Sequence, residues 1–148
     1  MTSRRNFIKK TTLAGAAITV GNSAMAMSAK SYNSIIGSNE RLNVAIAGLG
    51  RRLNAFKQPI ALKESNVKLL YLCDVMESQR TKGLQEFRKH IDYNPALEND
   101  IRKVLDDKNV DLLINATPDH WHTPGSIMAM KAGKHVYVEK PCSHNMYE

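Results

Sequence analysis

A glycine-rich segment is the first place in the chain where residue types and spacing suggest chemistry. Gly48 and Gly50 follow an apolar run directly. The first glycine of such a pair allows a tight turn, and the second lets the backbone approach a pyrophosphate. Leu53 stands where this fingerprint has a third glycine, so the pattern also fits a plain strand-to-helix turn. The segment indicates a dinucleotide phosphate loop only if other segments of the chain carry residues that also suit a dinucleotide.

Two arginines follow this segment, at the start of the expected helix. Arg51 and Arg52 oppose the helix dipole there, at a cost of about a few tenths of a kcal/mol each. A bound diphosphate would reverse that cost, and we count Arg51 among the cofactor-binding candidates. The alternative is that both side chains point into water.

An acidic residue ends the second apolar run, 26 positions after Gly48. Asp74 is suited to accept hydrogen bonds from the adenosine ribose hydroxyls, and it would repel a 2′-phosphate. The position therefore favours NAD over NADP. The alternative is that Asp74 caps a helix beginning near Ser78.

A loop with two histidines and a tryptophan follows a third apolar run. Its candidate cofactor-binding residues are Thr117, Pro118, His120, Trp121 and His122. The flat indole beside hydrogen-bonding imidazoles suits a nicotinamide and sugar pocket. His-x-His supplies two metal ligands at most, with no obvious further cluster, so we expect no metal site. The alternative is that both histidines cap the next helix.

The last apolar run ends in Glu139-Lys140-Pro141. A lysine at the carboxyl end of a parallel strand faces the ligand crevice, where it can hydrogen-bond a hydroxyl and assist proton transfer. Lys140 is therefore the catalytic candidate, and Glu139 a cofactor-binding one.

Strands and helices alternate along the chain and must position these residues. Buried strands are expected at 42–47, 67–73, 111–116 and 135–139, with a very short one near Tyr93. Helical spacing appears around 84–91, at 101–105 after an Asn99 N-cap, and from a Thr123 N-cap with Pro124 in first position. Pro59 leaves 51–65 unclear. The alternation predicts an α/β fold, a Rossmann-like doubly wound parallel sheet.

The N-terminal residues read as an export signal. Residues 1–26 contain Arg4, Arg5, an apolar run and Ala24-Met25-Ala26, in the order of a twin-arginine signal and cleavage site. The alternative is an amphipathic helix or a basic arm. Residues 27–40 read as a linker before the folded body at 41–148. Cleavage lowers the net charge of the 148-residue chain from +7 to +3, since four positive charges leave.

Composition excludes several classes of protein. No apolar run reaches the ~18–20 residues of a membrane span. Cys73 and Cys142 are too few for a disulfide scaffold, and the expected strand order 2-1-4-5 separates them by ~14 Å, so free thiols are expected. Basic residues around 80–89 are diluted by acidic neighbours, so no nucleic-acid partner is expected.

The motifs together resemble the N-terminal domain of the Gfo/Idh/MocA oxidoreductases, over about residues 41–148. The most specific stretch is ATPDHWHTPGSIMAMKAGKHVYVEKP at 116–141. The resemblance implies NAD bound across the strand ends by the residues singled out above. It also implies that Lys140 contacts substrate and cofactor during hydride transfer, and that the substrate is a sugar, an inositol or a related polyol.

The same resemblance implies a second α/β domain that supplies most of the substrate site, a further acid/base and the usual homo-oligomer interface. The chain is therefore expected to be truncated before that domain. The leading interpretation is the cofactor domain of an NAD-dependent oxidoreductase, exported by the twin-arginine machinery to the periplasm. The alternatives are the family's NAD-dependent glycosidase branch and a non-catalytic NAD-binding fragment. Whether this chain alone is an enzyme stays open.

Overall fold

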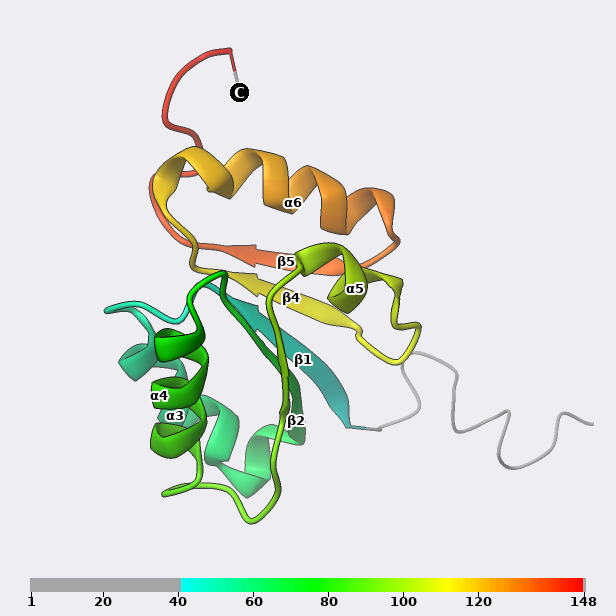
Figure 1. Ribbon diagram of the computed structural model, residues 1–148. Helices are drawn as coiled ribbons and strands as arrows, with labels where there is room; N and C mark the ends of the chain where they lie inside the picture. Colours follow the sequence, from blue (N-terminus) through cyan, green and yellow to red (C-terminus); the bar gives the residue numbers. More distant parts are fainter. Residues whose placement is uncertain (1–40, 148) are drawn as a thin grey trace, which may run out of the picture. The chain divides into compact units, whose positions relative to one another are not determined.

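Five strands, all parallel, form one sheet in the order β3-β2-β1-β4-β5 (Figure 1). The computed structural model describes residues 41–147, so the expected export signal and linker lie outside the described residues. The strands are β1 Leu42–Ala47, β2 Val67–Cys73, β3 Ala96–Glu98, β4 Leu112–Asn115 and β5 His135–Val138. The predicted parallel sheet is confirmed, including the order of its four main strands.

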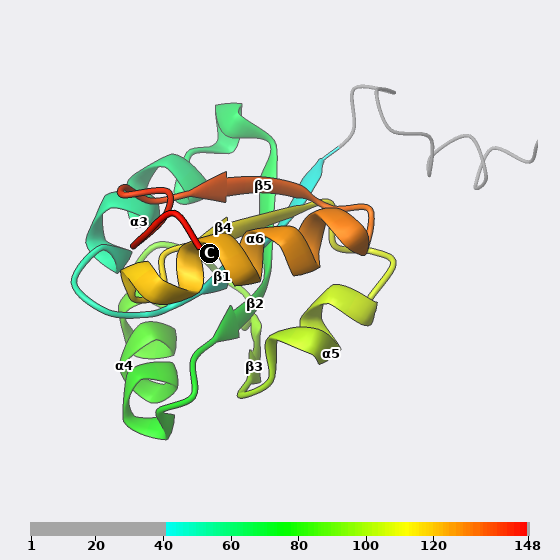
Figure 2. The same cartoon turned by 90° about the horizontal axis from the view of Figure 1, so that it is seen from above.

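Helices cover both faces of this sheet (Figures 1 and 2). They are α3 Leu53–Ala61, α4 Glu77–Phe87, α5 Ile101–Asp106 and α6 His122–Lys131, with short 3-10 turns η1 Lys63–Ser65 and η2 Asp119–Trp121. Each falls short of the length and apolar character that crossing a bilayer requires, within the part of the chain described.

Two apolar clusters fill the spaces between sheet and helices, because side chains alternate along a strand. Val44 and Ile46 of β1 point to α3 and α4 and pack with Phe56 and Phe87. Ala45 and Ala47 point the other way, into the cluster that includes Val104 and Leu105 of α5 and Ala129 of α6. Small alanines at the centre of the sheet leave room for these two helices.

The extra strand near the third helix exists, but not at Tyr93. β3 begins at Ala96, and the Tyr93 hydroxyl instead accepts a hydrogen bond of 2.9 Å from Leu69 N. The aromatic side chain thus satisfies the edge of β2 where β3 does not reach.

Two helix starts also differ from the prediction. Asp100, not Asn99, caps α5, and its Oδ1 accepts from Arg102 N at 2.9 Å. α6 begins at His122, so Thr123 and Pro124 lie inside its first turn, where a proline removes no intrahelical hydrogen bond. The side chains of His122 and Thr123 contact carbonyl oxygens after Lys140, as described below, so neither side chain caps the helix.

The segment around Pro59 is helical, because α3 runs through it and ends two residues later at Ala61. Leu53 and Ile60 of this helix are buried against the sheet, which offsets the hydrogen bond that the proline removes.

Candidate functional site

The carboxyl ends of the parallel strands bring the predicted site segments to one edge of the sheet. Gly48 N donates to Cys73 O at 2.9 Å, which joins the end of β1 to the end of β2. Glu139 N donates to Asn115 O at 3.0 Å and joins the ends of β5 and β4 in the same way. The four segments predicted from sequence therefore share one edge.

The structure requires glycine at position 48 but not at position 50 of this edge. Gly48 has a φ of +87°, and a Cβ there would lie 2.4 Å from Ala116 O, so only glycine fits. A Cβ at Gly50 would meet nothing within 4 Å. The first glycine is thus required by packing, whereas the second borders open space.

The start of α3 is a helix N-terminus without a side-chain cap, although Leu53 N donates to Gly50 O at 3.2 Å and Ala55 N donates to Arg52 O at 2.9 Å. Its N-cap residue, Arg52, makes no side-chain capping hydrogen bond, and the first turn holds no acidic residue. The positive end of a helix dipole favours an anion at such a place. Arg51 beside it is exposed.

The side chain of Arg52 is 58% exposed and forms an ion pair with the segment that precedes Lys140. Its Nη2 lies 2.7 Å from Oε1 of Glu139, which is 7% exposed. The hydrogen bond and charge of Arg52 lower the pKa of the Glu139 carboxyl, and Glu139 raises the pKa of Arg52. The expected cofactor-binding Glu139 is therefore committed to an ion pair with the start of α3.

Asp74 links the glycine-rich turn to α4. Its Oδ2 accepts from Leu49 N at 2.8 Å, and its Oδ1 accepts from Met76 N at 2.9 Å. Met76 is the N-cap of α4, which begins at Glu77. The carboxylate thus braces the turns at both strand ends rather than capping a helix near Ser78, and it stays partly exposed at the edge.

A buried amide that the sequence reasoning missed organises the loop after β4. Asn115 is fully buried, and its Nδ2 donates to His122 O at 2.9 Å while its Oδ1 accepts from the Thr117 hydroxyl at 2.6 Å. Asn115 could have been found from the sequence because it is a polar residue at the end of the apolar strand Leu112–Asn115, and a buried amide needs hydrogen-bond partners.

The two histidines of that loop have different environments. His120 is exposed, as are Pro118 and Trp121, so these three are open to a ligand. His122 is 3% exposed, with Nε2 2.7 Å from Thr117 O and Nδ1 2.5 Å from Pro141 O. Both ring nitrogens of His122 therefore face backbone carbonyl oxygens, and the ring does not cap the following helix.

Lys140 stands at the same edge with an exposed side chain. The peptide bond that follows it, to Pro141, is cis. The residues on either side of Lys140 are held by side-chain contacts, through Glu139 to Arg52 and through the Pro141 carbonyl to His122. The side chain of Lys140 is thus exposed, while the backbone on both sides of it is held by contacts of the neighbouring residues.

The two cysteines are both free thiols, as predicted. Burial raises the pKa of the Cys73 thiol to about 12, so it stays protonated near neutrality. Cys142 is exposed in the loop after Lys140. Within residues 41–147, no three or more His, Cys, Asp or Glu side chains gather in a way that could hold a metal ion.

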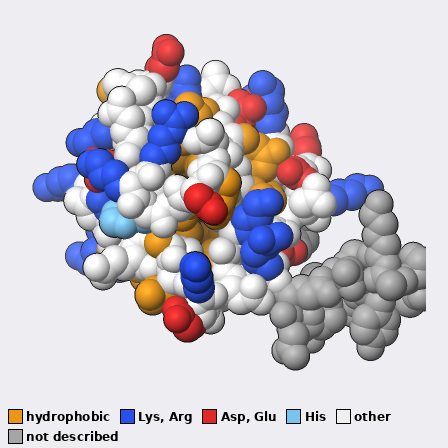
Figure 3. Space-filling model, turned by 90° about the horizontal axis from the view of Figure 1, so that it is seen from below, with side chains coloured by type: hydrophobic (Ala, Val, Ile, Leu, Met, Phe, Trp, Pro, Cys, Tyr) orange, Lys and Arg blue, Asp and Glu red, His pale blue; other side chains and the backbone are white. Residues whose placement is uncertain are grey.

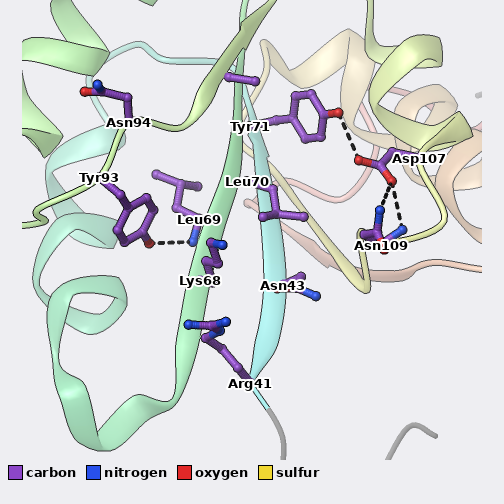
Figure 4. Close-up of a pocket in the computed structure, with 11 residues that line it drawn as sticks. Arg41, Asn43, Lys68, Leu69, Leu70, Tyr71, Tyr93, Asn94, Asp107 and Asn109 are labelled. Atoms are coloured by element: carbon purple, nitrogen blue, oxygen red, sulfur yellow. Dashed lines mark hydrogen bonds between the residues drawn. The ribbon is translucent and has the colours of Figure 1, made fainter. Parts of the chain in front are cut away.

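A cavity of about 510 Å³ lies at the opposite, amino ends of β1 and β2 (Figure 4). Arg41, Lys68 and Tyr93 line it, and Tyr71 donates to Asp107 at its rim. No residue predicted for the site contributes to this cavity. Figure 3 shows acidic side chains between the Lys and Arg side chains on the face that it draws, so the positive charge there is interrupted.

The model of an oxidoreductase family with an NAD-binding Rossmann fold matches residues 42–148. The chain belongs to the Gfo/Idh/MocA oxidoreductase family. The described body is the NAD-binding domain of that family. Sheets of this kind bind ligands at the carboxyl ends of their strands, the edge that the four predicted segments share.

Two curated proteins resemble nearly the whole of this chain at moderate sequence identity. A glycosyl hydrolase family 109 protein of Shewanella baltica is 29% identical over 98% of this chain and 35% of its own length. An alpha-N-acetylgalactosaminidase of Tannerella forsythia is 29% identical over 99% of this chain and 34% of its own. The chain thus spans about a third of these relatives.

Among solved structures, the WlbA dehydrogenase from Chromobacterium violaceum, in complex with NADH and UDP-GlcNAcA, superposes with a TM-score of 0.65. It is 21% identical, over 74% of this chain and 30% of the other. This likeness supports the fold.

The residues present fit a dinucleotide. The open side of Gly50 and the uncapped start of α3 suit the approach of a diphosphate, as the family fingerprint requires. The Asp74 carboxylate stands at the next strand end, where ribose hydroxyls need an acceptor. Gly48, Gly50 and Asp74 would hold NAD, with Arg51 and the exposed loop residues beside them.

Proposed function

We propose that this chain is the cofactor domain of an enzyme that oxidises a hydroxyl-bearing carbon of a sugar, inositol or related polyol. The observation that carries the proposal is the exposed Lys140 side chain at the same edge as the glycine-rich turn and Asp74. NAD supplies the hydride acceptor when bound.

The chain's own residues supply binding and proton handling. The start of α3 neutralises the diphosphate, and Asp74 selects an unphosphorylated ribose. Nζ of Lys140, in its amine form, hydrogen-bonds the substrate hydroxyl and takes up its proton as the C–O bond becomes a carbonyl. The rest of the substrate site, a second acid/base and any homo-oligomer interface are assigned to the family's second domain.

A second candidate is the NAD-dependent glycosidase branch, in which oxidation of the sugar precedes elimination. The names of the Shewanella and Tannerella relatives favour it, with alignments that cover nearly all of this chain. Release of a chromogenic aglycone from an α-N-acetylgalactosaminide without net NADH supports this branch. Accumulation of NADH in proportion to product supports the dehydrogenase.

The cofactor premise is tested with the single tryptophan of the chain, Trp121, which is 48% exposed in the loop after β4. NADH absorbs tryptophan emission, so titration should quench Trp121 fluorescence to saturation, and NADPH should quench it more weakly. Unchanged emission at millimolar NADH, after correction for absorption by unbound NADH with free tryptophan as the reference, contradicts the proposal for this chain.

Export by the twin-arginine route to the periplasm belongs to the same proposal and is supported by the order of Arg4, Arg5, the apolar run and Ala24-Met25-Ala26. Residues 1–26 fused to a folded reporter should direct it to the periplasm, and Arg4→Lys with Arg5→Lys should abolish this. Equal export by both fusions contradicts the assignment.

A further inference from the structure

Lys140 is held from both sides by residues distant in sequence. On one side Glu139 pairs with Arg52 at 2.7 Å, and on the other the Pro141 carbonyl oxygen lies 2.5 Å from Nδ1 of His122. The Lys140 side chain itself is exposed. A flexible four-carbon side chain therefore starts from a backbone that is fixed at both of its neighbours.

The His122 ring is built into the fold as a clamp. Both of its nitrogens face carbonyl oxygens, of Pro141 and of Thr117, and a carbonyl oxygen can only accept. A neutral ring donates from one nitrogen and a doubly protonated ring from both, so at least one carbonyl is always held. The His122 backbone is itself fixed, since its carbonyl accepts from Asn115 Nδ2 at 2.9 Å and from Ser126 Oγ at 2.6 Å.

Thr123, the residue after His122, makes a similar contact with Cys142, the residue after Pro141. Thr123 Oγ1 donates to Cys142 O at 2.8 Å. Consecutive residues at the start of α6 thus contact consecutive carbonyls after Lys140, and Figure 2 shows the C-terminal segment passing over this end of α6. This second contact is independent of the ring.

We propose that His122, assisted by Thr123, is a positioning residue that aims Lys140 rather than a residue that touches the cofactor. The inference rests on the proposed function, because it concerns the role of Lys140 beside bound NAD. Fixing the backbone narrows the region that Nζ samples, and a catalytic group misplaced by about 1 Å loses much of its effect.

The experiment measures Lys140 separately from cofactor binding. Acylation of Lys140 by an amine reagent is followed by mass spectrometry, with and without saturating NADH, while Trp121 quenching reports NADH binding in the same samples. A nitroxide on the exposed Cys142 reports mobility of the loop, and the buried Cys73 stays unlabelled.

Four variants separate the clamp from general stability. His122→Phe keeps a ring and removes both polar contacts. Thr123→Val removes the hydroxyl and Thr123→Ser keeps it, and His90→Gln changes an exposed histidine outside the site as a control.

We expect NADH to quench Trp121 in every variant and to protect Lys140 in the wild type, His90→Gln and Thr123→Ser. Protection should fall about threefold to tenfold in His122→Phe and Thr123→Val, as loss of a hydrogen bond implies, with a more mobile nitroxide. Equal protection and mobility in all chains overturns the positioning role.

If His122→Phe does not fold, the Val and Ser variants of Thr123 decide the question. If NADH fails to quench Trp121 in the wild type, the proposed function fails, whereas nitroxide mobility still reports whether the clamp holds the loop. The two failures are therefore distinguishable.

Discussion

Arg52 Nη2 and Glu139 Oε1 lie 2.7 Å apart although 87 residues separate them in the chain. The pair connects the start of α3, beside the glycine-rich turn, to the loop that carries Lys140. The ion pair thus joins the start of α3, proposed to bind the diphosphate, to the loop of Lys140, proposed to transfer the proton. Arg52 is 58% exposed in its side chain, so solvent screens the attraction.

Glu139→Gln should lower stability at neutral pH and make little difference in acid. Arg52 lowers the pKa of Glu139 below its ordinary 4.5, so the pair stabilises the fold above that value. This contribution disappears as pH falls through the lowered folded-state pKa. Urea unfolding of both chains at neutral pH and in acid measures the difference. A gap that stays constant with pH contradicts the ion-pair account.

Gly48→Ala should lower the stability of the protein, whereas Gly50→Ala should lower its affinity for NADH. The added methyl at Gly48 meets Ala116 O at 2.4 Å with φ at +87°, so unfolding should be easier by at least about 1–3 kcal/mol. At Gly50 the methyl meets no protein atom within 4 Å, so stability should change little while NADH affinity falls. Urea unfolding and Trp121 quenching measure the two effects. Unchanged NADH affinity in Gly50→Ala argues against a phosphate loop here.

Asp74→Asn should reduce the preference for NADH over NADPH. A neutral amide removes the repulsion of a 2′-phosphate and weakens the charged hydrogen bonds to ribose, by about tenfold in NADH affinity. The amide oxygen can still accept from Leu49 N, so the glycine-rich turn should persist, whereas the amide nitrogen cannot accept from Met76 N and the start of α4 loses that contact. The ratio of the two dissociation constants is the measurement, with Asp92→Asn as an exposed control. An unchanged ratio assigns Asp74 a bracing role alone.

Asn115→Leu should destabilise the protein by about 2–4 kcal/mol. The leucine matches the volume but removes the buried hydrogen bonds to the Thr117 hydroxyl and to the His122 carbonyl, which keeps only its bond from Ser126 Oγ. Thermal unfolding monitored by circular dichroism tests this, with exposed Asn54→Leu as the control. A loss as small as that of the control means that water replaces the amide.

The strands and the edge on which the site lies follow from local pattern. Apolar runs of strand length with helices between them have few foldable arrangements, and parallel pairing places every carboxyl end on one side. Gly48, Asp74 and Lys140 could therefore be assigned to one edge before any contact was known. The starts of the helices were harder to predict from the sequence. Thr123 is a residue type that often caps helices, but its hydroxyl donates to Cys142 O instead.

The sequence by itself determined the sheet, its strand order and the chemical types gathered at one edge, because hydrophobic periodicity and handedness are properties of short segments. Only the tertiary structure decided which of these polar groups pair with each other. Arg52 with Glu139 and His122 with Pro141 join segments 87 and 19 residues apart. Their contacts depend on strand register and helix docking, which no local pattern encodes, and buried polar groups then take the nearest partner that satisfies them.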